Sequence, residues 1–352
     1  MIIKEGLAKI EIPDYNNISK EMPVFYNPLS SIGRDIAVEV ASKLGIKNVL
    51  DPMSASGIRG IRYYLESNIR EVHFNDINPI AIEYIKKNLE LNNIKEGKII
   101  ISNLDARAIE QKYEYIDIDP FGSATPYLYL INNTSKYLAI TYTDTAVWTG
   151  EKHRKAYIRY NFNVIKTPIK HEIGVRGLVA HLINKGAEIE RALIPIYAHS
   201  AYHYYRVYML KRKGSNRIEK LKSQIGYLYY CPKCYYISES ESVCPYCKRK
   251  MFRIGPLYLG KLWAIKLDKR DYFNKQSNKI IERINEESEI DKPYYYELPS
   301  IAKALKTNIP PMDKIMEKLK ELGYKVERTH FSENGIRTNA PYYIIKTIFS
   351  SQ

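Results

Sequence analysis

An aspartate, a proline, an aromatic ring and a glycine follow one another at residues 119–122, directly after a short strand pattern. Residues 113–119 read YEYIDID, where apolar side chains alternate with Asp117 and Asp119 and predict a strand with one buried face. A carboxylate at a strand end suits a reaction in which positive charge develops on a nitrogen. Pro120 restrains the backbone beside it. Taken alone, the tetrapeptide is equally typical of a polar turn.

The residue types suit methyl transfer to an exocyclic amine of a nucleobase. Such an amine is a poor nucleophile, because its lone pair is delocalised into the ring. As it attacks a methyl sulfonium, a carboxylate and a backbone carbonyl that accept its N–H bonds stabilise the growing charge. The ring of Phe121 can stack on a base that has left its helix. The DPFG run is similar to the tetrapeptide of amino-directed nucleic-acid methyltransferases.

A loop of small residues, DPMSASGIRG (51–60), links a predicted strand to a predicted helix. In an open parallel sheet, ligands bind at the carboxyl ends of the strands. The loop is a degraded G-x-G-x-x-G with Ala55 in place of the first glycine, which is a weak motif. Asp76 ends the next strand and is placed to hold ribose hydroxyls. These two features indicate an adenosine-type cofactor and leave NAD and S-adenosylmethionine open.

Asp105, a few residues past the third strand, separates the two cofactors. An acid at this place in methyltransferases accepts from the adenine amino group, although an aspartate before a helix is more often an N-cap. Arg34 and Arg59 are cations that can pair with the methionine carboxylate. Each arginine taken alone is more typical of an ordinary surface residue, whereas Asp105 and Asp119 disfavour a NAD enzyme.

Strands and helices alternate over the first 210 residues, which predicts a parallel α/β sheet with helices on both faces. Residues 191–200 and 202–214 are two strands with almost nothing between them, so an antiparallel final pair is expected. The predicted strands are 47–51, 71–76, 98–102, 113–119 and 137–144.

All four cysteines lie between residues 231 and 247 as C-x2-C, nine residues, C-x2-C. Each pair aims two thiolates at one point, and two pairs complete a tetrahedron for zinc. Four thiolates leave no open position, so the metal is predicted to be structural. The alternative is a pair of redox dithiols. The predicted ligands are Cys231, Cys234, Cys244 and Cys247.

The 352 residues carry a net charge of +15, which favours a polyanionic partner. Residues 206–265 hold 13 basic and 3 acidic side chains, so most of the excess lies in one segment. The KRK runs at 211–213 and 248–250 are predicted phosphate contacts or, alternatively, a solvated surface. The sequence shows neither an apolar run of membrane-spanning length nor a signal peptide, so a cytoplasmic protein without membrane contact is expected.

Three domains are predicted. Residues 1–222 form the cofactor domain, 223–265 the cysteine module with an apolar return segment, and 266–352 a small α+β domain expected to contact RNA. In the last, helices are expected at 300–306 and 312–323, followed by a hairpin over 324–346, an arrangement similar to a winged helix.

The whole chain resembles the tRNA guanosine-26 N2-dimethyltransferase family in its archaeal form. The motifs span nearly the full length in the family's order: VFYNPLSSIGRD (24–35), DPMSASGIRGIRY (51–63), NDINP (75–79), LDARA (104–108), DIDPFGSATPYL (117–128), TYTDTAVWTG (141–150), GPLYLGKLW (255–263) and FSENGIRTNAP (331–341).

The resemblance implies a class I S-adenosylmethionine-dependent methyltransferase fold, with a mostly parallel Rossmann-like sheet and an antiparallel last strand. It implies that Asp119 is the catalytic acid and that Phe25 and Phe121 sandwich the target guanine. It implies a cofactor site made of Arg34, Arg59, Asp76, Asp105 and Ala106. The expected function is transfer of two methyl groups in succession to N2 of guanosine 26 in tRNA, by a monomer with a structural zinc.

Two other readings stay open from the residues alone. One is an amino-group methyltransferase acting at another nucleic-acid position. The other is an inactive zinc-ribbon RNA-binding protein, against which the intact DPFG run and cofactor acids argue. Asp144 fits the family pattern without an assigned role.

Overall fold

The computed structural model describes residues 1–14, 22–95 and 98–350. The chain forms two compact units. Unit 1 comprises 1–143, 206–212 and 265–281, and unit 2 comprises 144–205, 213–264 and 282–352. Neither unit is a continuous range, so they cross the three contiguous domains expected from the sequence. The three-domain division stays a prediction.

A seven-stranded sheet has the order β5-β4-β3-β6-β7-β9-β8. The pairings of β3 with β4 and β6, of β4 with β5, and of β6 with β7 are all parallel. Two residues join β8 to β9, a connection too short for parallel pairing, so the predicted antiparallel final pair is confirmed. The strands are β3 (Asn48–Asp51), β4 (Glu71–Asn75), β5 (Lys98–Ser102), β6 (Tyr113–Ile118), β7 (Thr134–Tyr142), β8 (Arg191–Ala201) and β9 (Tyr204–Lys213).

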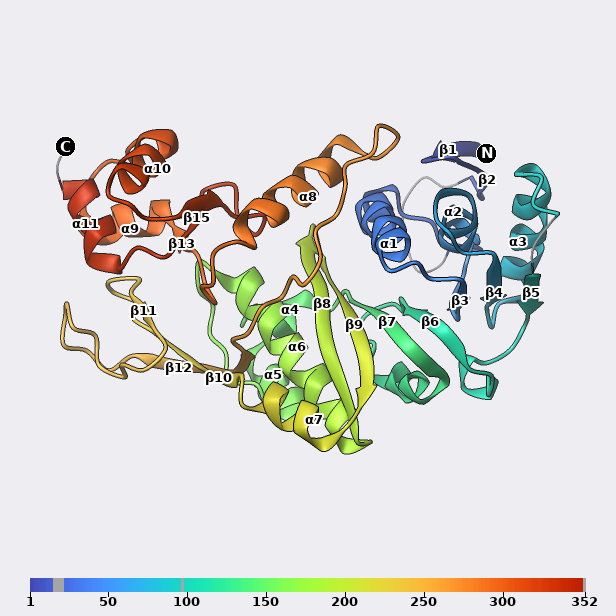
Figure 1. Cartoon of the computed structure of the whole chain (residues 1–352), viewed down its shortest axis with the longest axis horizontal. Coiled ribbons are helices and arrows are strands. Elements are labelled where there is room, and N and C mark those ends of the chain that lie inside the picture. Colours follow the sequence, from blue (N-terminus) through green and yellow to red (C-terminus); the bar gives the residue numbers. More distant parts are fainter. Residues whose placement is uncertain (15–21, 96–97, 351–352) are drawn as a thin grey trace. The chain divides into compact units, whose positions relative to one another are not determined.

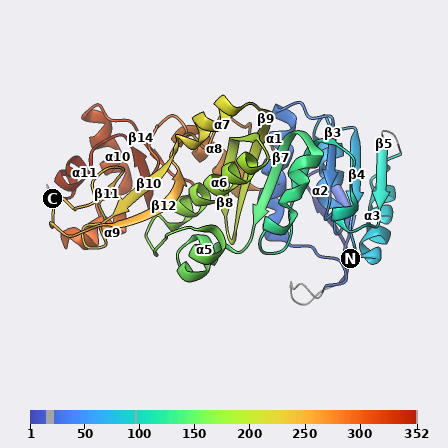
Figure 2. The ribbon, with the colours of Figure 1, turned by 90° about the horizontal axis from the view of Figure 1, so that it is seen from below.

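Three helices cover β3, β4 and β5 in unit 1 (Figure 1). The central one, α2, packs against β3 and β4 and is flanked by α1 and α3. Gly60 permits the close approach, because a Cβ there would lie 2.2 Å from the Phe74 ring on β4. Figure 2 shows the three strands next to one another beside these helices. The helices are α1 (Ser31–Lys43), α2 (Ile58–Glu66) and α3 (Pro79–Leu91), with 3-10 turns η1 (Pro28–Ser30), η2 (Ala106–Ala108) and η3 (Thr125–Asn133).

Strand β6 is buried on both faces, which corrects the expectation of a single buried face. Ile116 and Ile118 are fully buried, and so is Asp117 between them. A central strand of a parallel sheet is covered by helices or neighbouring segments on both sides, so alternation of polar and apolar residues does not mark a solvent face here.

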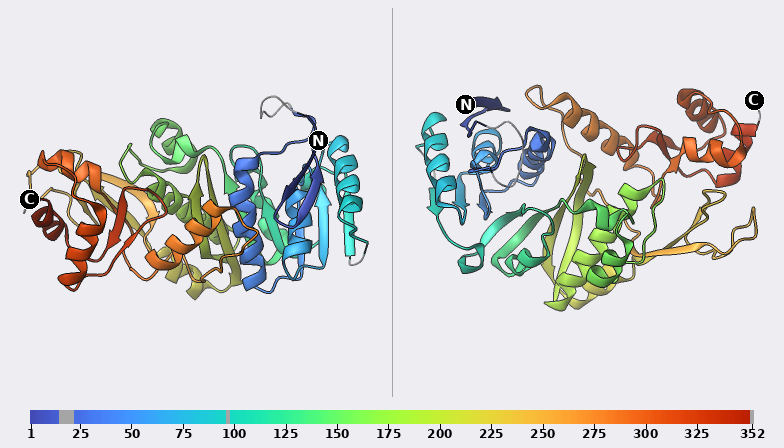
Figure 3. Two further views of the ribbon diagram at one scale, coloured as in Figure 1. Left: turned by 90° about the horizontal axis from the view of Figure 1, so that it is seen from above. Right: turned by 180° about the vertical axis from the view of Figure 1, so that it is seen from behind.

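A small N-terminal hairpin, β1 (Ile2–Glu5) with β2 (Ala8–Glu11), lies over α2 and α3 (Figure 3). Asn88 of α3 binds the hairpin directly: Glu11 N donates to its Oδ1 at 2.6 Å, and its Nδ2 donates to Glu11 O at 3.1 Å. These hydrogen bonds therefore make the hairpin an integral part of unit 1.

Unit 2 contains two further small sheets and most of the remaining helices. One sheet, of order β11-β10-β12, carries the cysteines, and the other has the order β13-β15-β14. The elements are α4 (Thr145–Trp148), α5 (His153–Tyr160), α6 (Lys170–Glu188), α7 (Ser215–Lys222), β10 (Ile225–Tyr230), β11 (Ile237–Ser238), β12 (Phe252–Tyr258), β13 (Tyr296–Glu297), α9 (Leu298–Leu305), α10 (Met312–Glu321), β14 (Val326–Arg328), β15 (Gly335–Thr338) and α11 (Tyr342–Ser350), while α8 (Lys275–Glu287) begins in unit 1.

The C-terminal hairpin prediction is partly wrong. Strands β14 and β15 do pair antiparallel, but residues 342–350 form helix α11 instead of extending the second strand. Tyr342, Ile345 and Phe349 are buried at helical spacing, so period 3.6 overrides the β-branched composition of this segment. None of the helices in the described part of the chain combines the length and apolarity of a membrane span.

Candidate active site

Buried Asn75 connects the loops that follow β3 and β5. Its Nδ2 donates to the carbonyl oxygens of Pro52 and Leu104, each at 3.0 Å. Its Oδ1 accepts from Ser102 Oγ at 2.7 Å. The carboxyl ends of β3, β4 and β5 are therefore held together by one side chain. Sequence reasoning missed Asn75 as a site-forming residue, although it precedes Asp76 in the NDINP motif.

Asp76 holds the first loop in place. Its Oδ2 accepts from Ala55 N at 2.8 Å and its Oδ1 from Asn78 N at 2.9 Å. Ala55 has a φ of 47°, a conformation that favours glycine, which explains why glycine is usual at this place in such loops. Each Asp76 oxygen keeps a second lone pair, so both can still accept from a ligand hydroxyl.

Asp105 caps the short turn η2, as its N-cap interpretation predicted. Its carboxylate accepts from Arg107 N at 2.9 Å and pairs with the Arg107 guanidinium. The hydrogen bonds from Arg107 lower the pKa of Asp105 to about 2. Ala106, the next residue, is buried. The expected contact of this pair with adenine stays a prediction.

Asp119 and Arg59 form an ion pair at the carboxyl end of β6. Arg59 Nη2 donates to Asp119 Oδ2, and Arg59 Nη1 lies 3.6 Å from Asp117 Oδ2. The Asp119 side chain is 26% exposed, whereas that of Asp117 is fully buried. Among the residues that the structure describes, none donates to Asp119 Oδ1. The acid of the DPFG run is therefore the carboxylate of this cluster that reaches solvent.

Asp117 and Arg206 form the buried base of the cluster, and neither was among the predicted site residues. Arg206 Nη2 donates to Asp117 Oδ2 at 2.5 Å, and Arg206 Nη1 lies 4.0 Å from Asp119 Oδ2. Tyr63 also donates to Asp117 at 2.5 Å. Burial alone would raise the pKa of Asp117, but Arg206 and Arg59 lower it below the usual value. The alternation in YEYIDID draws attention to Asp117. In contrast, no feature of the sequence around Arg206 indicates that this arginine is buried.

Asp51, at the end of β3, is a buried acid without a full set of partners. Its Oδ2 is buried and, within the described ranges, accepts no hydrogen bond. Burial and the negative charge of Asp117 raise its pKa to about 8, against the opposing effect of Arg59. The DPMSASG loop marks Asp51 as a strand-end acid, but the sequence did not predict it as a site residue.

Phe25 and Phe121, predicted to sandwich the target guanine, lie in contact with each other, and the sandwich itself stays a prediction. Their ring centroids are 4.6 Å apart and the rings meet edge to face at 85°. Phe121 is 48% exposed. Gly122 N donates to Thr143 Oγ1 at 2.7 Å and Thr143 N donates to Gly122 O at 2.9 Å, so the end of β7 holds the turn beside Phe121. A base between the rings requires them to separate.

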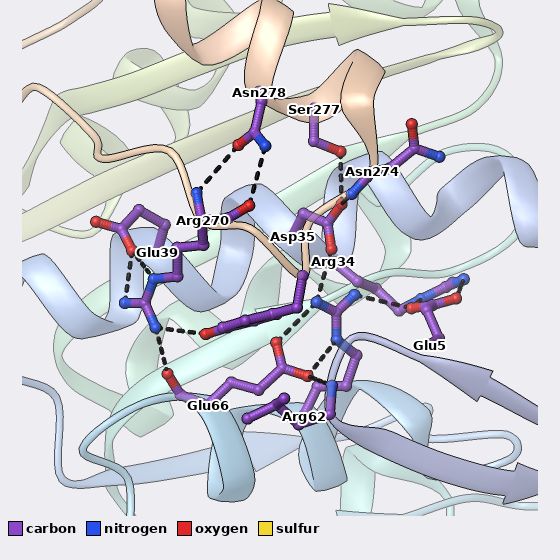
Figure 4. A network of polar contacts seen from close by, with 12 residues as sticks. Glu5, Arg34, Asp35, Glu39, Arg62, Glu66, Arg270, Asn274, Ser277 and Asn278 are labelled. Carbon is purple, nitrogen blue, oxygen red and sulfur yellow. Dashed lines mark hydrogen bonds and ion pairs between the residues drawn. The ribbon is translucent and has the colours of Figure 1, made fainter.

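Arg34 belongs to a second group of charges, a buried network that includes the N-terminal hairpin (Figure 4). Its Nε and Nη2 donate to Glu5 at 2.7 and 2.6 Å. Arg62 also donates to Glu5, at 2.9 Å. Burial would raise the pKa of Glu5, but Arg34 and Arg62 bring it down to about 2. The predicted contact of Arg34 with the cofactor stays a prediction, since Glu5 already occupies two of its nitrogens.

The rest of that network links α1, α2 and the segment that leads into α8. Arg62 Nη2 donates to Asp35 at 2.6 Å, and Asp35 Oδ2 accepts from Ser277 Oγ at 2.5 Å. Arg270 donates to Glu39 at 2.6 Å. Figure 4 shows these side chains converging between the helices. The network thus anchors residues 265–281 in unit 1.

The four cysteines meet as predicted, in unit 2. Their sulfur atoms all lie within 4.8 Å of one another, and Cys231 Sγ is 3.6 Å from Cys247 Sγ. A tetrahedral zinc with Zn–S bonds of about 2.3 Å separates its sulfurs by roughly 3.8 Å. All four thiols are free of disulfides. The donor set and spacing therefore fit a closed structural zinc site.

The structure also shows the surroundings of Lys211 and Asp144. Lys211, a predicted phosphate contact, is buried, and its Nζ donates to Ile131 O and Thr134 O at 2.6 and 2.7 Å. Its ammonium is therefore not at a phosphate-facing surface, which corrects that prediction. Asp144 in unit 2 accepts from Tyr160 OH at 3.5 Å, and burial raises its pKa.

Comparison with known proteins relates the whole chain to tRNA-modifying enzymes. The family model described as N2,N2-dimethylguanosine tRNA methyltransferase matches residues 6–350. The tRNA (guanine(26)-N(2))-dimethyltransferase of Sulfurisphaera tokodaii is 38% identical, over 96% of this chain and 95% of the relative. The tRNA (guanine(26)-N(2)/guanine(27)-N(2))-dimethyltransferase of Aquifex aeolicus is 35% identical, over 97% and 93%.

One solved structure matches almost the full length. Trm1 from Pyrococcus horikoshii, in complex with S-adenosyl-L-methionine, superimposes with a TM-score of 0.85 at 31% identity and covers 98% of each chain. The sheet order described above and this match agree on a class I methyltransferase fold.

Proposed function

The chain belongs to the N2,N2-dimethylguanosine tRNA methyltransferase family, and we propose that it transfers two methyl groups in succession from S-adenosylmethionine to N2 of guanosine 26 in tRNA. The observation that carries the proposal is the partly exposed carboxylate of Asp119. It directly follows β6, two residues after the buried acid Asp117, and β6 pairs with β3, whose other neighbour in the sheet is β4.

The loops at this sheet edge fit S-adenosylmethionine, which when bound supplies an electrophilic methyl group on a sulfonium. Asp76 keeps acceptor capacity for ribose hydroxyls, and Asp105 with Ala106 would hold the adenine. Arg59, and Arg34 if it leaves Glu5, would bind the carboxylate of the methionine part. The buried Oδ2 of Asp51, which accepts no hydrogen bond from the described residues, supports this fit, because a cationic ligand beside it would satisfy that acceptor and favour the ionised form of the acid.

Asp119 would hold the amine while it reacts. Its Oδ1, which accepts no hydrogen bond from the described residues, can accept an N–H of the guanine N2. As the new N–C bond forms, positive charge develops on N2, and the carboxylate stabilises it. The methyl–sulfur bond of the donor would break in the same step, and one proton of N2 would pass to the Asp119 carboxylate that accepts its N–H. The monomethylated amine keeps one N–H, so the same contact serves the second transfer.

Phe25 and Phe121 would hold the extruded base. Stacking between two rings is tolerant of small displacements and leaves the amino edge of guanine facing Asp119. The turn that carries Phe121 is fixed by Thr143, which gives the ring a defined starting position. In the structure the rings touch each other, so capture of the base includes their separation.

The cysteine cluster, closed by four thiolates, has a structural function in this proposal. We further propose that the enzyme acts as a monomer in the cytoplasm and uses residues 266–352 in tRNA contact. The pronounced positive charge of +15 supports an RNA partner.

The test is to incubate the purified protein with unmodified tRNA and labelled S-adenosylmethionine, and to map the product by nuclease digestion and mass spectrometry. The expected result is N2-methylguanosine that converts to N2,N2-dimethylguanosine at nucleotide 26. A guanosine-to-adenosine change at nucleotide 26 is the matched control and should abolish the product. Label at nucleotide 27 would extend the site assignment, and label on another base would contradict the proposal.

A further inference from the structure

Helix α5 is a cationic surface element that the active site does not use. Residues 152–159 read KHRKAYIR and contain four lysines and arginines and no acid. Lys152, Arg154, Lys155 and Arg159 are all exposed. Among the described residues, Lys152, Arg154 and Lys155 make no ion pair, and Arg159 reaches Asp144 only at 3.9 Å.

The arrangement of these charges is unfavourable for the isolated protein. Lys155 and Arg159 stand four residues apart on the helix, where like charges destabilise it. The chain supplies no acidic residue within α5 to offset them. An anionic partner along this face removes the repulsion, whereas water and salt only screen it.

Two large apolar side chains lie among the cations. Ile158 is 70% exposed, the largest value for a large hydrophobic residue in the part of the chain that the structure describes, and Tyr157 is 63% exposed. Arg154, Tyr157 and Ile158 stand at i, i+3 and i+4, so they share one face of α5. Exposed apolar side chains of this size, gathered on one face, mark an interaction site.

Anchors at its C-terminal end hold α5 firmly in unit 2. The Tyr160 ring stacks on Trp148 with centroids 4.3 Å apart, and Ala156 is fully buried. Asn161 ends the helix at φ 48°, and Asn163 N and O bond to Gly255 at 2.9 Å. Figure 2 shows α5 at the edge of the ribbon of this unit. A helix that is firmly held in unit 2 thus presents to solvent a face that carries both cationic and apolar side chains.

We propose that this face of α5 binds the tRNA, with the cations on backbone phosphates and Tyr157 stacked on a base or ribose. Charge complementarity selects a polyanion, and the aromatic ring among the cations suits an RNA with accessible bases. This inference rests on the proposed function and adds a docking surface outside the segment 206–265 in which the basic excess is concentrated.

The main test is the triple variant Lys152→Gln/Arg154→Gln/Lys155→Gln, which keeps good helix formers. Affinity for unmodified tRNA, measured by fluorescence anisotropy from 50 to 300 mM salt, should fall roughly 10-fold or more near physiological salt. The log–log salt slope should flatten by about 0.7 to 0.9 for each phosphate that the variant no longer neutralises. The affinity for S-adenosylmethionine should not change.

A second triple variant, Lys86→Gln/Lys87→Gln/Lys112→Gln, removes the same charge from exposed positions of unit 1. It should bind tRNA within about two-fold of the parent, because charges away from the phosphates contribute little. Equal losses of affinity in both triples, or an unchanged slope in the α5 triple, would overturn the proposal. Tyr157→Ala should weaken binding roughly 5-fold or more, and Tyr157→Phe should retain parental affinity because it keeps the ring.

A photo-crosslinking side chain, benzoylphenylalanine, at position 158 identifies the occupant directly. Crosslinking to tRNA supports the proposal, whereas crosslinking to a second copy of the chain, or to neither, contradicts it. Methylation by the parent protein is assayed in parallel. If the parent methylates tRNA and the α5 variants bind normally, only this inference fails; if the parent binds tRNA through α5 but does not methylate it, the proposed function fails.

Discussion

The guanidinium of Arg59 donates to one carboxylate oxygen of Asp119 and leaves the other available. Both residues belong to the predicted site, one as a cofactor ligand and the other as the catalytic acid. Their pairing means that a ligand carboxylate at Arg59 and a substrate amine at Asp119 act on one charge cluster. The buried ion pair of Asp117 and Arg206 completes this charge cluster.

Asp119→Ala should slow methyl transfer by on the order of 10² or more, the usual scale for losing one preorganised electrostatic partner. Asp119→Asn keeps an acceptor oxygen without the charge. Its rate of methyl transfer should lie between those of the parent and Asp119→Ala. Single-turnover rates on tRNA carrying guanine or N2-methylguanine at nucleotide 26 measure the first and the second methyl transfer. Both rates should fall by a similar factor.

The affinities of Asp119→Ala for S-adenosylmethionine and tRNA serve as controls and should stay within a few-fold of the parent. If the variant methylates either substrate at a near-parental rate, Asp119 is a structural strand end and the mechanism is wrong.

Phe121→Ala should weaken capture of the extruded base by about 1–3 kcal/mol, the cost of a lost stacking partner. Phe121→Tyr keeps the ring and should behave like the parent. Fluorescence of 2-aminopurine at nucleotide 26 reports base extrusion. If Phe121→Ala produces the same change in fluorescence on mixing with this tRNA as the parent does, the ring does not hold the base.

Purified protein should contain one zinc per chain, measured by elemental analysis without chelators. The double variant Cys231→Ser/Cys247→Ser should lose the metal and unfold at a lower temperature, because metal binding contributes directly to folding. Val243→Ser, at an exposed position of the same module, is the matched control and should retain both. Metal-free protein of parental stability would contradict this prediction.

Asp51→Asn should become more stable relative to the parent as pH rises from 5 to 9. The raised pKa of about 8 means that the folded parent holds a proton that the unfolded chain releases above about pH 4. The stability from this group is therefore complete below that pH and is lost as pH rises through 8. The variant cannot ionise and avoids the loss. Urea unfolding at a series of pH values measures the difference.

Asp271→Asn, at an exposed position of unit 1, is the control for removal of one acidic group. Its stability difference from the parent should vary little over the same pH range. A flat profile for Asp51→Asn as well would mean that the buried acid does not titrate there.

Local patterns were enough to place the predicted groups on their elements. Asp119 directly follows β6, Asp76 directly follows β4 and Asp105 caps η2. Short runs of neighbouring residues are enough to indicate strand ends and turns. The four cysteines needed only their spacing. The C-terminal helix α11 was missed, since its residues favour a strand composition and burial at period 3.6 decided otherwise.

By itself, the sequence determined the family, the parallel sheet with its strand-end acids and the four-thiolate cluster, because each is recorded in neighbouring residues. Tertiary structure alone decided which charges are buried and with which partners. Arg34 pairs with Glu5 and Arg206 with Asp117, across 29 and 89 residues, while Lys211 binds backbone carbonyls and α5 stays exposed. The physical reason is that the desolvation and pairing of a charge depend on every segment packed around it, and the folded chain brings those segments together from distant positions.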